Sequence, residues 1–142
     1  MNAKFSRSLK LAVLCLSAAG VQTALATDYV MIVNKDNPNV VDKEFAAKVY
    51  KGEAKSWKDG SAVAAYDLPE DNPARAAFDG EVVGKTPSQL RALWASLTFS
   101  GKALPPKAAA NDAEVIAAVA ANKNALGYVS AAPSNAAVKT VK

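Results

Sequence analysis

The amino-acid sequence predicts an α/β fold, a three-layer αβα domain with a mostly parallel sheet. Two observations predict it. Short apolar runs rich in β-branched and aromatic residues alternate along the chain with segments in which apolar residues recur every three or four positions. The first run, residues 29–33, is apolar at every position, which is typical of a strand covered on both faces. Strands that alternate with helices favour a sheet packed between two helical layers.

Capping and apolar spacing place the first helix and the second strand. Residues 34–39 are polar and contain a proline, so we expect a loop there. Asp42 can cap a helix, and Gly52 stands where that helix would end. The apolar face of this helix would consist of Phe45, Ala46, Val49 and Tyr50. After a turn at residues 57–60, residues 62–66 are expected to form the next short strand.

Proline marks the start of two further helices. Asn72 can cap a helix that has Pro73 at its first position, where the missing N–H group is not needed. Residues 86–89, Thr-Pro-Ser-Gln, form a capping box with the same placement of proline. Gly101 would end the second of these helices. The residues that this helix is expected to bury are Leu90, Leu93, Trp94 and Leu97.

The C-terminal third predicts one helix and two strands. Residues 104–110 form a loop or a short extended segment. Residues 111–114, Asn-Asp-Ala-Glu, can cap a helix whose buried stripe is Val115, Ile116 and Val119. Residues 126–129 are expected to form a strand, and residues 137–141 a last strand at the edge of the sheet.

Residues 1–26 have the features of a secretory signal peptide. Three basic residues precede an apolar stretch, residues 11–20, that is too short to cross a bilayer. Residues 24–26, Ala-Leu-Ala, offer a cleavage site before Thr27. A retained membrane anchor is the alternative. Cleavage would leave one domain, residues 27–142, in the periplasm.

Charge and residue usage exclude several classes of function. The chain has 17 basic and 13 acidic residues, and three of the basic residues lie in the signal. The domain therefore has 14 basic and 13 acidic residues and a net charge of +1. This balance gives no reason to expect nucleic acid as a partner. The chain has no histidine, and its single cysteine, Cys15, lies in the signal. Imidazole and thiolate chemistry are therefore excluded, and we expect no enzymatic activity, cofactor or metal.

Asp67, Glu70 and Asp71 form the one dense acidic group of the domain. Two carboxylates can carry glycoside hydrolysis, and clustered acids can hold calcium, so both alternatives remain open. The spacing does not match the Asp-x-Asp-x-Asp-Gly calcium loop. We interpret the group as solvated loop acids that favour the positive end of the following helix dipole.

Four short motifs follow one another along the domain. They are the apolar strand at residues 30–34, the helix end Val-Tyr-Lys-Gly at residues 49–52, the turn Trp-Lys-Asp-Gly at residues 57–60 and the strand at residues 125–130. In this order they resemble the opening strand, the end of the first helix, the turn and the closing strand of the second lobe of the phosphate-type substrate-binding proteins of bacterial ABC transporters. The resemblance covers essentially the whole domain and implies a single lobe of a periplasmic-binding-protein-like fold.

The resemblance implies an exported, non-enzymatic protein that binds a small oxyanion for an ABC transport system, with phosphate first among the candidates. Free N–H groups at a helix start and the fork of an arginine can hold such an anion, and the helix that starts near Asn72 offers both. Strand ends are the usual ligand positions of open α/β sheets. The expected ligand-binding residues are Asn34, Lys35, Asn72, Ala74, Arg75 and Ser130.

Two features alter this expectation. The family carries an Arg and a Ser-Gly-Thr where this chain has residues 67–75, whose acids weaken an anion site or change its selectivity. The domain is also long enough for only one of the two lobes that close on a ligand. The alternative is therefore a degenerate lobe that acts as a protein-interaction or sensor module of the envelope. Expected partners are the oxyanion and an inner-membrane permease or another envelope protein.

Overall fold

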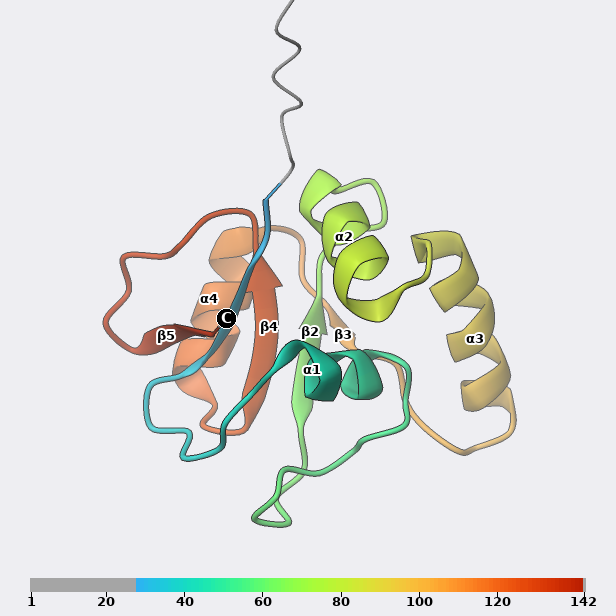
Figure 1. The fold of residues 1–142 in the computed structure, drawn as a ribbon, viewed down its shortest axis with the longest axis horizontal. Coiled ribbons are helices and arrows are strands. Elements are labelled where there is room, and N and C mark those ends of the chain that lie inside the picture. Colours follow the sequence, from blue (N-terminus) through green and yellow to red (C-terminus); the bar gives the residue numbers. More distant parts are fainter. Residues whose placement is uncertain (1–27, 142) are drawn as a thin grey trace, which may run out of the picture.

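The computed structural model describes residues 28–141, so the predicted signal peptide lies outside the described residues. Within this range the chain forms one five-stranded sheet in the order β3-β2-β4-β1-β5 (Figure 1). The strands are β1 (Val30–Asn34), β2 (Ala64–Asp67), β3 (Lys107–Ala108), β4 (Ala125–Val129) and β5 (Val138–Val141). The predicted α/β fold is confirmed, and β5 lies at an edge as expected.

The sheet is mixed, because β1 runs against its two neighbours. β2 is parallel to β3 and β4, whereas β1 is antiparallel to β4 and β5. The register pairs Val30 with Val129 and Val33 with Leu126. Two of the four pairings are therefore parallel and two antiparallel. A continuous apolar run, such as the one that predicted β1, carries no information about strand direction.

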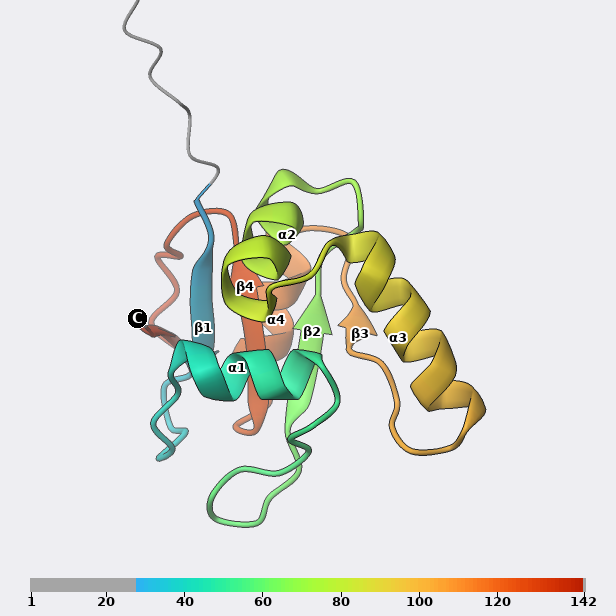
Figure 2. The same cartoon turned by 45° about the vertical axis from the view of Figure 1, so that its right-hand side comes forward.

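Helices cover both faces of the sheet. Figures 1 and 2 show α4 (Asp112–Ala121) on one face, and α1 (Lys43–Tyr50) and α2 (Pro73–Phe78) on the other. A π-helical turn, η1 (Asp79–Val83), continues α2, and α3 (Pro87–Phe99) lies beyond the β3 side of the sheet. The predicted caps form: Asp42, Asn72 and Asn111 each accept a backbone N–H, and Thr86 and Gln89 complete a capping box. The layered arrangement places the strand ends at two opposite edges of the sheet.

Aromatic rings fill the core between the sheet and the α1–α2 layer. The ring of Phe78 stacks on that of Tyr128, with a centroid distance of 4.0 Å, and Tyr50 packs edge-on against Phe78 at 4.8 Å. On the other face, Gly127 lets α4 approach β4. A Cβ atom added to Gly127 would lie 2.6 Å from Cγ1 of Val115, so a larger residue cannot fit without a shift. β4 is thus closely packed on both faces of the sheet.

Helix α3 is packed less fully than its sequence predicts. Of the four residues expected to be buried, only Leu90 is buried, and Leu93, Trp94 and Leu97 are half-buried. Phe99, at the C-terminal end of α3, is 96% exposed. The expectation of a fully buried stripe is wrong, because α3 lies to one side of the sheet (Figure 2) and buries only Leu90 completely.

Candidate functional site

The parallel arrangement of β2, β3 and β4 brings their C-terminal ends to one edge of the sheet, which we call the β2/β4 edge. β2 ends there at Asp67, and β4 is followed by Ser130. The loop after β2 leads into α2, so four of the six predicted ligand-binding residues lie at or near this edge: Asn72, Ala74, Arg75 and Ser130.

The other two predicted residues, Asn34 and Lys35, lie at the opposite edge. We expected them to lie with the other strand ends, but β1 is antiparallel to β4, so its C-terminal end faces away from the β2/β4 edge. Asn34 is buried, and its Nδ2 donates to the carbonyl oxygens of Val119 at 2.9 Å and Ala120 at 3.0 Å. The expectation that these two residues share one site with Arg75 is therefore wrong.

The start of α2 uses its own amide groups. The side-chain oxygen of Asn72 accepts the N–H of Ala74 at 2.9 Å, and the backbone carbonyl of Asn72 accepts the N–H of Arg75 at 3.0 Å. Pro73 has no N–H group to offer. Ala74 is also buried, at 1% exposure. The amides that sequence reasoning assigned to an anion are thus engaged within the helix.

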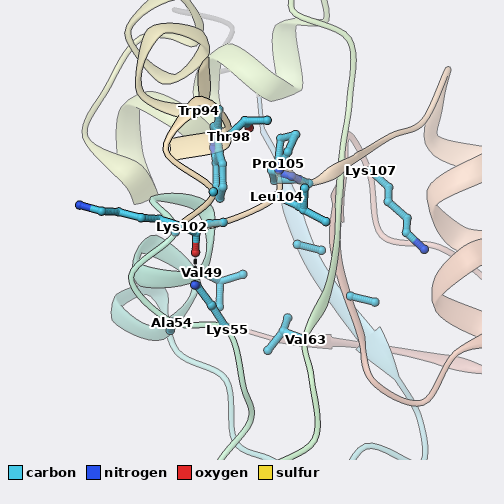
Figure 3. Close-up of a pocket in the computed structure, with 16 residues that line it drawn as sticks. Val49, Ala54, Lys55, Val63, Trp94, Thr98, Lys102, Leu104, Pro105 and Lys107 are labelled. Carbon is cyan, nitrogen blue, oxygen red and sulfur yellow. Dashed lines mark hydrogen bonds between the residues drawn. The ribbon is translucent and has the colours of Figure 1, made fainter. Parts of the chain in front are cut away.

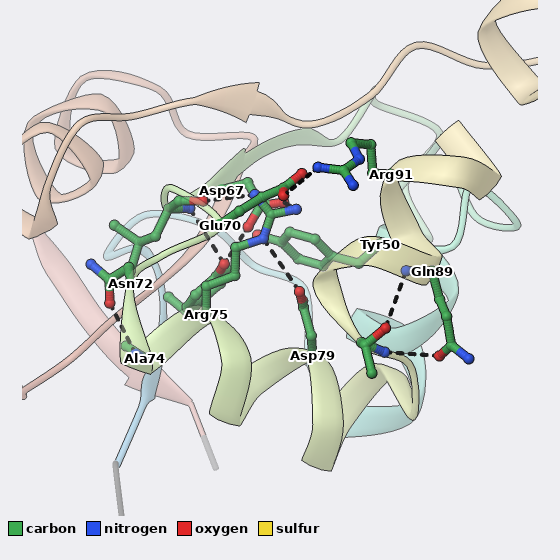
Figure 4. Close-up of polar contacts among 12 residues, drawn as sticks. Tyr50, Asp67, Glu70, Asn72, Ala74, Arg75, Asp79, Gln89 and Arg91 are labelled. Carbon is green, nitrogen blue, oxygen red and sulfur yellow. Dashed lines mark hydrogen bonds and ion pairs between the residues drawn. The ribbon is translucent and has the colours of Figure 1, made fainter. Parts of the chain in front are cut away.

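The guanidinium of Arg75 is held by three groups of the chain (Figure 4). Nη1 donates to the carbonyl oxygen of Leu68 at 2.9 Å, Nε donates to Oδ2 of Asp79 at 3.3 Å, and Nη2 lies 3.4 Å from Oδ2 of Asp67. The side chain of Arg75 is only 13% exposed. Arg75 therefore joins the end of β2 to the end of α2.

Burial of the two carboxylates raises their proton affinity. Desolvation, together with the nearby charge of Asp67, raises the pKa of Asp79 to about 6, although Arg75 acts against the shift. Desolvation also raises the pKa of Asp67, against the hydrogen bond that the Tyr128 hydroxyl donates to its Oδ1. Burial raises the pKa of Tyr128 and keeps it protonated as that donor.

Sequence reasoning missed Asp79 and Tyr128 as members of this cluster. A signal for Asp79 was present, because it follows Arg75 by four residues and such pairs share one face of a helix. Tyr128 carried no comparable signal, since its contact with Asp67 depends on the pairing of β2 with β4.

The accessible charges of the β2/β4 edge lie in the loop after β2 and in the first turns of α3 and α4. Nη1 of Arg91, in the first turns of α3, donates to Oε2 of Glu70 at 2.9 Å, and both side chains are well exposed. The backbone N–H of Ser130 donates to Oδ2 of Asp112 at 3.0 Å, and its hydroxyl donates to the same oxygen. The edge thus combines hydrogen-bond donors with a larger number of carboxylates.

Calcium binding and glycoside hydrolysis were the alternatives that the sequence left open for Asp67, Glu70 and Asp71. Within residues 28–141 no group of three or more acidic, histidine or cysteine side chains is placed to hold a metal ion. Asp67 is engaged by Arg75 and Tyr128 and Glu70 by Arg91, so the acidic group predicted from sequence is divided between separate contacts. No helix in the same range is long and apolar enough to cross a bilayer.

Comparison with known proteins defines the class of fold. No family model and no curated protein matches the chain. Among solved structures, it is similar to a protein of Clostridium perfringens assigned as a phosphate ABC transporter substrate-binding protein and containing bound phosphate. The TM-score is 0.64 at 21% identity, and the match covers 80% of this chain and 44% of that one.

Two further structures agree with this match. A phosphate transport receptor of the ABC type from Vibrio cholerae has a TM-score of 0.59 at 18% identity, over 80% of this chain and 45% of its own. A protein of Planctomyces limnophilus described as a possible phosphate binding protein has a TM-score of 0.59 at 16% identity, over 80% of this chain and 40% of its own. The chain therefore has a periplasmic-binding-protein-like fold and spans less than half the length of these proteins.

Proposed function

We propose that the chain is an exported, non-enzymatic lobe that binds a small oxyanion, phosphate first among the candidates, as part of an ABC transport system. The observation that supports this proposal is the fold, whose matched structures are described as phosphate transport or phosphate-binding proteins. The β2/β4 edge is the proposed position of the anion, because open α/β sheets bind ligands at the carboxyl ends of parallel strands.

The acids of the β2/β4 edge predict which oxyanion binds. Asp67, Glu70, Asp71 and Asp112 outnumber Arg75 and Arg91 there. Phosphate keeps a P–O–H proton near neutral pH and can donate it to a carboxylate, whereas sulfate has no such proton. Each close contact between a carboxylate and a sulfate charge costs on the order of 1 kcal/mol in water-like surroundings. We therefore expect the edge to prefer phosphate over sulfate.

The affinity of the lobe alone is expected to be low. Arg75 is engaged by Asp67, Asp79 and Leu68, so the guanidinium open to an anion is that of Arg91. An anion reaches Arg91 by displacing Glu70, and an exposed ion pair of this kind contributes less than about 1 kcal/mol. Water covers the other side of the bound anion. A dissociation constant on the order of 1 mM follows from so few charged contacts.

Calorimetry with phosphate, sulfate and small carboxylates at constant ionic strength tests the proposal directly. We expect phosphate to bind more tightly than sulfate. The Arg91→Gln variant should raise the dissociation constant for phosphate about fivefold. The matched control, Lys123→Gln, removes an exposed charge near the opposite edge and should leave binding unchanged. Absence of any response to phosphate at millimolar concentration would remove the oxyanion proposal.

Export is part of the proposal and has its own test. Mass spectrometry of the protein recovered from a periplasmic extract should give a chain that begins at Thr27. A protein that keeps residues 1–26 and sediments with membranes would instead indicate a retained anchor.

A second candidate function is favoured by one observation. The helix-start amides and the guanidinium of Arg75 are all engaged within the chain, which is the arrangement expected of a lobe that has lost its ligand and serves as an interaction module of the envelope. Capture of a specific partner from envelope extract, with no phosphate binding, would favour this function. A strictly monomeric protein without a partner would argue against it.

A further inference from the structure

A pocket of about 590 Å³ lies away from the β2/β4 edge, between α3, the end of α1 and β2 (Figure 3). Its walls are mainly apolar and include Val49, Val63, Trp94 and Leu104. Its volume falls within the range of roughly 300–1,000 Å³ that small-molecule pockets occupy. The incomplete docking of α3 leaves this space open.

The ring of Trp94 forms a fixed wall of the pocket. Its Nε1 donates to the carbonyl oxygen of Tyr50 at 3.0 Å, which ties α3 to the end of α1. Gly52 makes this contact possible, because it has a φ of +76° and an added Cβ would lie 3.1 Å from the Trp94 ring and 2.8 Å from Cδ1 of Leu97. The wall is thus built by specific contacts of the fold.

Small side chains line the pocket together with Trp94. Ala54, Ala64 and Ala65 line it together with Thr98, which is exposed on α3. The half-buried strand β2 consequently presents partly accessible apolar surface to the pocket. Apolar surface beside an unfilled space lacks dispersion contacts that a ligand of matching size would supply.

The charges around the pocket are all positive. Its lining includes Lys55, Lys102 and Lys107 and no carboxylate. Figure 3 shows Lys55 reaching across to the backbone carbonyl of Lys102, to which its Nζ donates, while the other two lysine side chains extend away from the space. Glu53, the nearest acid in sequence, pairs with Lys51 at 3.7 Å. Lys55 therefore has no carboxylate partner among residues 28–141.

We infer that this pocket binds a small amphiphilic carboxylate, with its apolar tail against Trp94, Val63 and the alanines and its carboxylate on the ammonium of Lys55. The apolar lining excludes a fully polar anion such as phosphate, and the lysines select a negative headgroup over a positive one. This site differs from the proposed oxyanion edge in position and in ligand chemistry, so each can fail without the other.

Three eight-carbon probes test the inference: octanoate, octanol and octylammonium, each followed by calorimetry on the purified protein. We expect octanoate to bind with a dissociation constant about fivefold lower than that of octanol, and octylammonium to bind more weakly than either. The Lys55→Gln variant should abolish the advantage of octanoate over octanol. Lys58→Gln, an exposed lysine three residues further on, should preserve it. Equal binding of octanoate and octylammonium would overturn the inference.

Two indole N–H signals in the NMR spectrum locate the ligand. Trp94 lines the pocket, and its Nε1–H donates to the carbonyl oxygen of Tyr50. Trp57 is only 3% exposed, and its Nε1–H donates to the carbonyl oxygen of Asn124 at 3.0 Å. Octanoate should shift the Trp94 signal and leave the Trp57 signal in place. Thr98→Trp should fill the pocket and abolish the shift, and Ser96→Trp, exposed on the same helix outside the lining, should not. A shift that survives Thr98→Trp, or self-association of the protein without octanoate binding, would contradict the assignment.

Discussion

Nε of Arg75 donates to Oδ2 of Asp79 at 3.3 Å, while Oδ1 of Asp79 is buried without a hydrogen-bond partner among residues 28–141. The carboxylate of Asp79 is fully buried. It shares the single positive charge of Arg75 with Asp67, so two carboxylates face one guanidinium. An ionised, half-satisfied carboxylate in this position costs free energy, which explains why its pKa rises to about 6.

The first prediction concerns the dependence of stability on pH. The pKa of Asp79 in the folded protein, about 6, lies above its ordinary value of 3.8, so the folded state binds the proton more tightly than the unfolded state. The free energy of unfolding should therefore fall as pH rises from about 4 to about 6, by roughly 2–3 kcal/mol, and level off above pH 6. Urea titrations at several pH values measure this slope.

Substitution of Asp79 identifies the group responsible. Asp79→Asn should stabilise the protein by about 1–2 kcal/mol at pH 7 and flatten the slope between pH 4 and 6. Asp71→Asn, an exposed acid of the loop after β2, serves as the control and should leave the slope unchanged. A steep slope that persists in Asp79→Asn would assign the effect to Asp67, because the two carboxylates titrate as a coupled pair.

The second prediction concerns the junction of α1 and α3. Gly52→Ala should destabilise the protein by about 2–4 kcal/mol, because it adds a clash with Leu97 and Trp94 to the cost of a positive φ. Gly84 has a φ of +75° with nothing within 4 Å of an added Cβ, so Gly84→Ala should cost only about 1 kcal/mol. The difference between the urea midpoints of the two variants measures the energetic cost of the clash. Equal losses of stability in the two variants would show that α3 shifts to accommodate the added methyl group at no energetic cost.

The third prediction separates two roles for Asn34. Asn34→Ala removes the donor to Val119 and Ala120 and should lower the free energy of unfolding by about 2–3 kcal/mol. Phosphate binding should not change, since Asn34 lies at the edge opposite Arg75. Asn135→Ala, which removes an exposed local contact, is the matched control for stability. A loss of phosphate affinity in folded Asn34→Ala would restore Asn34 as a ligand-binding residue.

The fourth prediction concerns selectivity at the β2/β4 edge. Glu70→Gln frees Arg91 and removes one negative charge, so it should raise the affinity for sulfate more than that for phosphate. Competition calorimetry with the two anions measures the ratio of the affinity for phosphate to that for sulfate, which should fall about fivefold. Glu53→Gln, a distant exposed acid, should leave the ratio as in the parent protein. A ratio that stays fixed in Glu70→Gln would exclude Glu70 from the site.

Local signals in the sequence predicted most of the elements. The caps at Asp42, Asn72, Thr86 and Asn111 were predictable because each depends on residues within three positions of the helix start. The apolar runs identified the long strands for a similar reason. Strand direction was not predictable, because β1 meets β4 across more than ninety residues and its apolar pattern reads the same in both directions.

The candidate site was predictable only in part. Sequence reasoning placed Arg75 at the start of a helix beside a strand end, which the fold confirms as a location. It could not show that Arg75 is held by Asp67, Asp79 and Leu68, because that depends on how far the loop after β2 folds back over α2. The incomplete docking of α3 was hidden for a related reason: an apolar stripe shows which face of a helix prefers burial and not whether a partner surface reaches it.

The pairing of β1 has a consequence for biogenesis. Both neighbours of β1 in the sheet, β4 and β5, come from the last seventeen residues of the described chain, so β1 stays without a strand partner until residues 125–141 are available. Contacts between such distant segments slow folding. The sheet of the described residues therefore closes only when β4 and β5 are in place beside β1.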